Sequence, residues 1–594
     1  MLTFIKSILS IISKKDMSLI IRMSVILVII SFIEFFGLAM ISFLIINIGS
    51  MDTLVSRFPI LNSLGIESDL VPLLLSFVVC AYALFSISIS ISFLKFVSLN
   101  SQLIAGRIKL KLIDYYLSLG WLEHIQNSSS EKISRIQNDA TYVGQQILFA
   151  MHLFSRLALA LIITTALLFY NLAVTGIMVI SLTLSYLMIF KFFKPRISKN
   201  SSIVAKERDL ALRALTNMFG SIKEIIFYNS RSKVLSSFDE MNIKVASSEG
   251  INMYLAQIPR FIIDSLLLIA LVLFAAFYTT QEISASSFLE TVSVYGVAGL
   301  KLLPAFQNIF YFASEIQARS KYLNNITPLI TKIITQESLK LSEEDYPFKR
   351  LVEFSNVSFS YETGSKEALR DLSLKIEAGK KIAIIGPSGS GKSTFIDILL
   401  GFINPNIGQI AIDGKPLKEI NYIKYRENFA YVPQKLFLLE ASLRENIIFG
   451  SRESINSKDR LTKALFNSTA NTFVGDFSAG IDTLVSDSNL SLSGGQKQAI
   501  GIARAMYHGG KILVLDEATS AMDAMLEQKI MGEIAQSNFK TIIAITHKPS
   551  MLKYFDEIYV FNKGTIEANG TYEDLKSTNK FLSEMINISE SGAN

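Results

Sequence analysis

Two long uncharged stretches constrain this chain more than any other feature. Residues 157–190 and 71–94 contain no Asp, Glu, Lys or Arg. About 20 consecutive apolar residues suffice to cross the hydrocarbon core of a bilayer. The first stretch is long enough for two crossings, and Asn171 and Gly176 are expected to flank a tight external turn between an antiparallel pair. The sequence therefore predicts a multi-pass membrane protein.

Three further apolar segments contain charged residues and complete a set of six predicted spans: 24–48, 262–281 and 286–314. The first two are interrupted only by Glu34 and Asp264, respectively. The last contains Glu290 and Lys301, which a helix facing lipid would not tolerate, so we expect it to line a polar cavity. A short apolar run after Lys6 lacks a small-residue cleavage signal and is interpreted as an elbow helix on the inner membrane surface.

The distribution of positive charge sets the predicted orientation. Residues 95–144 and 192–254 are rich in Lys and Arg, which favours a cytoplasmic location for both segments and for both termini. Their helical periodicity predicts that the membrane helices continue far beyond the bilayer, with short helices at the turns near 119–127 and 212–230. Two ordinary cytoplasmic loops remain the alternative at this point.

Composition excludes several classes of partner and site. The net charge of +6 does not indicate a nucleic-acid partner, because the basic residues lie between hydrophobic spans, where a membrane protein keeps its cytoplasmic charge. Cys80 is the only cysteine, which excludes disulfide frameworks and cysteine-ligated metal sites. The composition changes near residue 338. We therefore predict a membrane domain over 1–337, a linker over 338–350 and a soluble α/β domain over 351–590.

The α/β part contains a phosphate-binding loop. The apolar run 381–385 is followed by the pattern G-x-x-x-x-G-K-S and then by a helix-like segment, the setting that this loop requires. Its backbone N–H groups and Lys392 would hold ATP phosphates, and the Ser393 hydroxyl would bind Mg²⁺. A plain glycine turn is the alternative, which the strand–helix setting disfavours. The residues predicted to bind ATP here are Gly386, Ser388, Gly389, Ser390, Gly391, Lys392, Ser393 and Thr394.

A second apolar run, 512–515, ends in two carboxylates, Asp516 and Glu517. After a phosphate-binding loop, these are the expected second half of an ATPase. Asp516 is placed to hold Mg²⁺, and Glu517 to polarise the attacking water as a catalytic residue. Taken alone, such a strand end is common and usually only solvated.

The segment Leu-Ser-Gly-Gly-Gln at 492–496 makes the chain resemble the ABC transporter family. The resemblance implies that Ser493, Gly494, Gly495 and Gln496 contact the ATP held by a second copy, so the working unit would be a homodimer. It also implies an all-α six-helix transmembrane domain followed by an α/β P-loop nucleotide-binding domain. In this half-exporter arrangement the two turning helices resemble coupling helices.

Other family marks occur in the family's order, each weak alone. The resemblance implies adenine stacking by Tyr361, an ATP and Mg²⁺ contact by Gln434, an ATP contact by Asp523 and a catalytic switch role for His547. Three departures from the family pattern leave these catalytic groups in place: an X-loop at 484–491 without its usual glycines, Ala499 in place of a basic residue, and Thr-His-Lys-Pro at 546–549. ATP and Mg²⁺ are thus the expected cofactors.

The substrate is predicted from three short stretches, around Glu34, Ile258–Arg260 and Lys301–Pro304, which resemble bacterial flippases of lipid-linked oligosaccharides. Arg260 and Lys301 would bind a diphosphate headgroup while the lipid tail stays in the bilayer, with Glu34 as a third candidate. Snorkelling of Arg260 and a structural role for Glu34 are the alternatives. The resemblance to these flippases implies a bacterial inner-membrane protein in contact with membrane lipids. A peptide or hydrophobic-drug exporter remains possible; the six spans exclude a non-transport ABC ATPase.

Overall fold

The structure is a computed structural model, and it describes residues 8–47, 70–126, 128–280, 285–336, 346–361, 366–417, 422–451, 458–486, 492–537 and 539–591. The chain divides into two compact units. Met1–Leu119 and Glu123–Ser338 form the first, and Gly120–Leu122 and Leu339–Asn594 form the second. The predicted external loops at 49–69 and 281–284, the linker at 338–345 and the X-loop at 487–491 lie outside the described residues.

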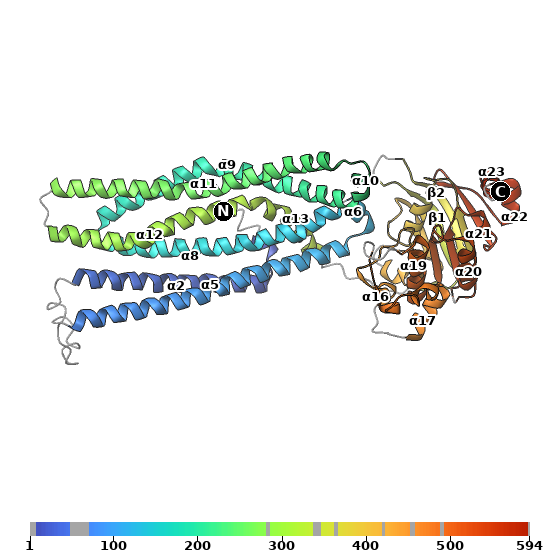
Figure 1. Cartoon of the computed structure of the whole chain (residues 1–594), viewed down its shortest axis with the longest axis horizontal. Helices are drawn as coiled ribbons and strands as arrows, with labels where there is room; N and C mark the ends of the chain where they lie inside the picture. The colour runs from blue at the N-terminus through green and yellow to red at the C-terminus, as the bar shows by residue number, and fades with distance from the viewer. Residues whose placement is uncertain are drawn as a thin grey trace. The chain divides into compact units, whose positions relative to one another are not determined.

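The first unit is entirely helical in its described part, as Figure 1 shows. Its six long helices are α2 (Lys14–Asn47), α5 (Val71–Ser118), α8 (Ala140–Tyr170), α9 (Leu172–Gly220), α11 (Arg231–Thr280) and α12 (Ala285–Ala318), and α13 (Ser320–Gln336) follows them. Four helical segments are long and apolar enough to cross a membrane within the described residues: Lys14–Ile45, Val71–Ser118, Ser129–Tyr170 and Leu172–Gly220. The predicted all-α membrane domain is confirmed.

The turn between α8 and α9, predicted to be external, is tighter than the sequence suggested. α8 ends at Tyr170 and α9 begins at Leu172, so Asn171 alone makes the turn. Its backbone is extended, and its side chain accepts a hydrogen bond of 3.1 Å from Val174 N, capping α9. Gly176 was predicted to flank this turn, and that was wrong: it lies inside α9, where the cap has already started the helix.

The helices of this unit are much longer than a membrane is thick. α9 has 49 residues and is therefore about 70 Å long, against about 30 Å for a hydrocarbon core. Short helices lie at the turns between long ones, α6 (Trp121–Gln126) and α10 (Ile222–Phe227), both without buried residues. The long helices and the short helices at their turns are thus present, and continuation of the long helices beyond the bilayer stays a prediction.

Close packing between α5 and α8 depends on a glycine. A Cβ added at Gly144 would lie 2.6 Å from the Cβ of Ala105 and 3.3 Å from the carbonyl oxygen of Ser101. The neighbouring core residues Ile104, Leu112 and Ile147 are at most 1% exposed. Any larger residue at Gly144 would therefore separate the two helices.

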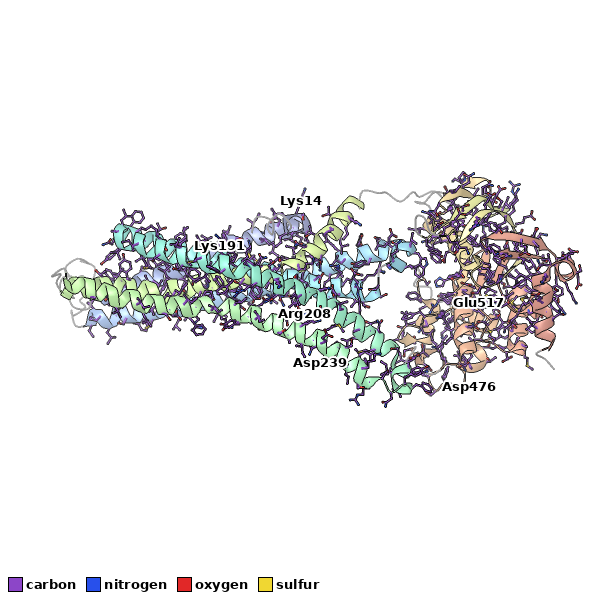
Figure 2. All side chains as sticks on the ribbon, turned by 90° about the horizontal axis from the view of Figure 1, so that it is seen from above. Lys14, Lys191, Arg208, Asp239, Asp476 and Glu517 are labelled. Carbon is purple, nitrogen blue, oxygen red and sulfur yellow. The ribbon has the colours of Figure 1, made fainter. Side chains whose placement is uncertain are left out.

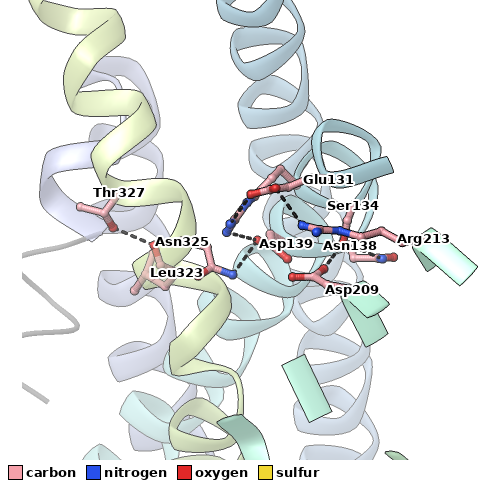
Figure 3. Close-up of polar contacts among 10 residues, drawn as sticks. Glu131, Ser134, Asn138, Asp139, Asp209, Arg213, Leu323, Asn325 and Thr327 are labelled. Atoms are coloured by element: carbon pink, nitrogen blue, oxygen red, sulfur yellow. Dashed lines mark hydrogen bonds and ion pairs between the residues drawn. The ribbon is translucent and has the colours of Figure 1, made fainter. Parts of the chain in front are cut away.

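A polar network links the elements on one side of α8, shown in Figure 3. Asp139 is 2% exposed and ends a π-helical segment, η2 (Arg135–Asp139), that follows α7 (Ser129–Ser134). It accepts hydrogen bonds from Asn325 of α13 and from Arg135. The other members connect α7 to η2 and α9 through the pairs Arg135–Glu131, Arg213–Glu131 and Ser134–Asp209. Polar side chains thus bind α7, η2, α9 and α13 together.

The second unit is built on a six-stranded sheet of order β12-β11-β3-β10-β9-β6, parallel except at the β12 edge. Its strands are β3 (Lys381–Ile385), β6 (Phe429–Val432), β9 (Ile512–Asp516), β10 (Thr541–Ile545), β11 (Glu557–Asn562) and β12 (Thr565–Gly570). The two apolar runs read as buried strands from the sequence are β3 and β9, which both pair with β10. This confirms the predicted α/β domain.

A second sheet has the order β2-β1-β4-β5 and is antiparallel: β1 (Leu351–Phe359), β2 (Leu369–Glu377), β4 (Ile407–Ile412) and β5 (Lys415–Pro416). The strands β7 (Ala441–Ser442) and β8 (Leu484–Val485) form a short pair. The helices that position the site are α14 (Lys392–Leu399), α19 (Gly494–His508) and α20 (Ala524–Ala535). The remaining elements are α15 (Tyr422–Arg426), α16 (Leu443–Ile448), α17 (Lys458–Asn467), α18 (Asn471–Val474), η4 (Gly480–Asp482), α21 (Pro549–Leu552), α22 (Tyr572–Thr578) and α23 (Lys580–Ser591).

Candidate functional site

The phosphate-binding loop runs from the end of β3 to the start of α14. Gly386 has φ of +149°, and a Cβ there would lie 2.2 Å from the carbonyl oxygen of Phe561. Gly391 has φ of +102° and meets the carbonyl oxygen of Ala368 in the same way, at 2.6 Å. Only glycine fits these two positions, because the loop is both left-handed there and pressed against neighbouring backbone. The sequence pattern thus produces a tight loop that ends on a helix N-terminus.

The polar groups of this loop suit a nucleotide phosphate. Lys392 is 7% exposed, and its Nζ donates to the carbonyl oxygens of Gly386 at 2.8 Å and Pro387 at 3.0 Å. Burial lowers the pKa of Lys392, and the nearby carboxylates of Glu517 and Asp516 oppose that shift. Ser390 Oγ is buried and has no hydrogen-bond partner among the described residues. The first turn of α14 also offers backbone N–H groups and its positive end to an anion.

The other residues predicted to bind ATP lie in this loop or beside it. Ser388 and Ser393 are exposed, and Gly389 has φ of +75°. Thr394 is buried, and its hydroxyl lies 3.1 Å from that of Tyr361. Tyr361 is 39% exposed and packs edge-on against Phe359. The tyrosine predicted to stack on adenine is thus held beside the phosphate-binding helix.

Glu517 is the point where the predicted catalytic groups meet. It follows β9 directly, is labelled in Figure 2, and has a positive φ of 49°, unusual for a residue with a side chain. Gln434 Nε2 donates to its Oε2 at 2.7 Å, and His547 Nε2 lies 3.2 Å from its Oε1. Two residues far from Glu517 in the sequence, Gln434 and His547, therefore hold its two carboxylate oxygens.

Asp516 lies next to this carboxylate at the end of the same strand. Burial raises its pKa to about 6, and Glu517 adds to this, while Lys392 and a hydrogen bond with Tyr431 act in the opposite direction. Two carboxylates and a lysine beside a phosphate-binding loop form a set that suits Mg²⁺ bound to phosphate, because the metal charge would offset the cost of the buried carboxylate. Tyr431 was not singled out from the sequence.

The signature segment forms the N-terminus of α19. Ser493 is its N-cap, and it forms a capping box with Gln496: Gln496 N donates to Ser493 Oγ at 3.2 Å, and Ser493 N donates to Gln496 Oε1 at 2.9 Å. Gly494 and Gly495 pack against the backbone and side chain of Ala521, where a Cβ at Gly494 would lie 2.9 Å from that of Ala521. The signature is thus a rigid helix start that presents backbone N–H groups.

The turn at 517–523 is held by two residues that the sequence analysis did not assign to the site. Gln498 of α19 donates to Ser520 Oγ at 3.0 Å and accepts from Ala521 N at 3.1 Å. Lys548 Nζ donates to the carbonyl oxygens of Thr519 and Met522 at 2.9 and 3.0 Å. Asp523 is the N-cap of α20. The signature helix and the segment after His547 therefore fix this turn from two sides. The one sequence feature that could have pointed to Lys548 is its position directly after His547.

The predicted substrate residues all lie in the first unit; an ion pair joins Glu34 and Lys301, whereas Arg260 pairs within its own helix. Arg260 is 67% exposed and lies 3.8 Å from Asp264 on its own helix, α11. Lys301 of α12 lies 3.7 Å from Glu34 of α2. Arg156 of α8 also approaches Glu34, at 3.5 Å. Arg156 was missed because it stands just before the uncharged stretch at 157–190 and reads as its boundary.

Comparison with known proteins supports this fold. The family model described as ABC transporter matches residues 369–520. The chain is 30% identical over 457 residues to a Rickettsia felis protein named export ATP-binding/permease protein, a match that covers 75% of this chain and 78% of that one. It is 35% identical over 289 residues to the sophorolipid transporter of Starmerella bombicola, covering 47% of this chain and 22% of that protein.

A solved structure has the same fold over nearly the whole chain. The structure of a bacterial Atm1-family ABC exporter with ATP bound superposes with a TM-score of 0.78 and covers 97% of this chain and 99% of that one. The two sequences are 21% identical, so this likeness concerns the fold. It includes both the helical unit and the α/β unit described above.

Proposed function

This chain belongs to the ABC transporter family as a half-exporter with an ATPase coupled to transport, and we propose that it flips a lipid-linked oligosaccharide or a related glycolipid across the bacterial inner membrane. The working unit is a homodimer with the ATP-binding domain and both termini in the cytoplasm. In this proposal 1–337 is the membrane domain, 338–350 the linker and 351–590 the ATP-binding domain, and α6 and α10 act as coupling helices.

One observation carries the choice of substrate. Lys301 lies in the middle of α12, a mostly apolar helix that also contains Glu290 and Glu315. Its side chain is 47% exposed and lies 3.7 Å from Glu34. A cation within a membrane helix is costly, and it marks a substrate or ion pathway more often than a lipid-facing surface. A phosphate headgroup would interact favourably with Lys301 and with the exposed Arg260. A glycolipid also agrees with the name of one relative, the sophorolipid transporter.

The ATPase part of the proposal assigns roles from the geometry of the second unit. Lys392 and the loop N–H groups hold the phosphates, and Ser393, Gln434 and Asp516 are the residues that would hold Mg²⁺. Bound Mg²⁺ supplies charge neutralisation on the phosphate oxygens. Glu517 orients the attacking water, with His547 and Gln434 fixing its two carboxylate oxygens. Ser493 and the Gly494 and Gly495 N–H groups close the site of the second copy.

Reconstituted vesicles test this function. Purified dimers in liposomes should translocate a fluorescent polyprenyl-diphosphate-linked oligosaccharide with ATP, and this lipid should stimulate their ATPase more than peptides or hydrophobic drugs do. Arg260→Gln combined with Lys301→Gln should abolish translocation, with the yield of folded dimer measured in parallel. Translocation at the wild-type rate in this double variant, or ATPase stimulation by drugs alone, would overturn the proposed substrate.

A further inference from the structure

A cavity of about 190 Å³ lies between α2, α5 and α8 in the first unit. Its walls are mostly apolar and include Phe93 and Leu94 of α5. Its charged lining comes from Glu34 of α2 and Arg156 of α8. An apolar cavity with a small number of convergent polar groups is the usual form of a ligand site.

Among the described side chains, the charges at this cavity and beside it do not balance; Lys301 of α12 is not part of the lining but approaches the same carboxylate. Glu34 Oε2 lies 3.5 Å from Arg156 Nη1 and 3.7 Å from Lys301 Nζ, so two cations share one carboxylate. Both distances exceed that of a good hydrogen bond, and Glu34 Oε2 is buried without a hydrogen-bond partner among the described residues. Within the part of the chain that the structure describes, this group therefore has one positive charge in excess, in a place where an uncompensated charge is costly.

An anionic ligand would correct this imbalance. The Arg156 side chain is 32% exposed and the Lys301 side chain 47%, so both remain accessible, whereas the Glu34 side chain is only 14% exposed. A guanidinium binds phosphate through two parallel N–H donors, which a lysine cannot do. The apolar walls of α5 suit an acyl or prenyl chain attached to that phosphate.

We infer that Arg156 and Lys301 form a binding site for the phosphate or diphosphate headgroup of a lipid, and that Glu34 is an internal anion that the headgroup displaces. This inference rests on the proposed function and names the residues and the competition at its substrate site. Arg156 binds the headgroup directly. Glu34 holds both cations in place when no headgroup is bound and sets the affinity, because every headgroup must compete with it.

The test measures ATPase stimulation of the full-length dimer in phosphatidylcholine vesicles that contain increasing amounts of a polyprenyl diphosphate. Loss of a hydrogen bond between charged groups in Arg156→Gln should raise the half-saturating amount about tenfold to a hundredfold. Glu34→Gln should lower it, because the competing anion is gone. Lys191→Gln removes an exposed cation of α9 outside the cavity and should leave the half-saturating amount unchanged.

Three further arms separate the possible failures. Arg156→Lys keeps a charge for Glu34 and should fold even if Arg156→Gln does not, yet it should still weaken stimulation, because the paired donors are lost. A neutral polyprenol should not stimulate. If free pyrophosphate stimulated the ATPase as strongly as the lipid, the conclusion that the recognised phosphate belongs to a lipid would be wrong.

The outcomes for the inference and for the proposed function differ. Stimulation of the wild type with an unchanged half-saturating amount in both Arg156 variants would overturn the inference and leave the proposed function standing. So would a Glu34→Gln variant that binds more weakly than wild type, because it would make the carboxylate a ligand or a structural partner. A wild-type protein that never responds to polyprenyl diphosphate would overturn both.

Discussion

Replacing Lys548 by Met tests whether the turn at 517–523 is held from the switch segment. The ammonium group of lysine has three N–H donors. Two are bonded to the carbonyl oxygens of Thr519 and Met522, and Nζ lies 3.3 Å from Glu527 Oε1. A methionine keeps much of the side-chain volume but removes all three interactions. The variant therefore isolates the charge from the packing.

The expected loss follows from the burial of the partner. The Glu527 side chain is 4% exposed, and removing one partner of a buried ion pair costs about 3–5 kcal/mol. Lys548 is 32% exposed, so water screens part of the interaction, and we expect about 3 kcal/mol. For a domain of this size, that corresponds to a fall of about 6–12 °C in Tm. ATPase should fall as well, because the turn follows Glu517 directly.

Thermal unfolding and ATPase of the full-length protein in detergent separate these two effects. Lys548→Arg keeps the charge and is the matched control. Lys548→Met combined with Glu527→Leu removes the stranded carboxylate and should recover most of the lost Tm, but not the ATPase, because the two carbonyl contacts stay broken. A single variant that melts within about 2 °C of wild type, or a double variant without recovery, would refute the reasoning.

Three other predictions concern catalysis, assembly and packing. Glu517→Gln should bind ATP and trap a closed dimer with turnover reduced by orders of magnitude, measured as phosphate release; turnover near wild type would contradict the role given to this carboxylate. Mixed dimers of Lys392→Ala and Ser493→Arg chains should retain one intact composite site and measurable ATPase, whereas each homodimer should have none; equal activity in monomers would exclude the trans arrangement. Gly144→Ala should lower Tm by a few degrees through a clash with Ala105, and Ala105→Gly in the same chain should restore it, unless α5 and α8 can move apart freely.

The ATP-binding residues could be predicted because each motif is contiguous in the sequence. The loop from Gly386 to Ser393 encodes its own conformation: the left-handed positions are glycines and the helix begins at Lys392. The capping box of Ser493 and Gln496 is likewise local. The roles of Gln434 and His547, by contrast, were predicted from the resemblance to a family. The structure places both side chains at the Glu517 carboxylate.

Interactions that join distant segments could not be read in this way. Gln498 and Lys548 hold the turn after Glu517 only because α19 and the segment after β10 pack beside it. A glutamine and a lysine are ordinary surface residues in any sequence window. Gly176 shows the opposite error, because a glycine that resembles a turn signal lies within a helix whose start is set by the Asn171 cap.

The membrane domain shows most clearly why contacts between distant residues could not be predicted from the sequence. Hydropathy counts the charges in each span: it found Glu34 alone in the span 24–48, and Lys301 together with Glu290 in the span 286–314. The cost of a buried charge, however, depends on its partner, and the partners here come from three different helices. Arg156 stands one residue before a charge-free stretch and is invisible as a site residue until α8 is packed against α2. With Arg156 included, the site changes from a neutral Glu34–Lys301 pair to a cluster with one excess positive charge, and this excess calls for an anion.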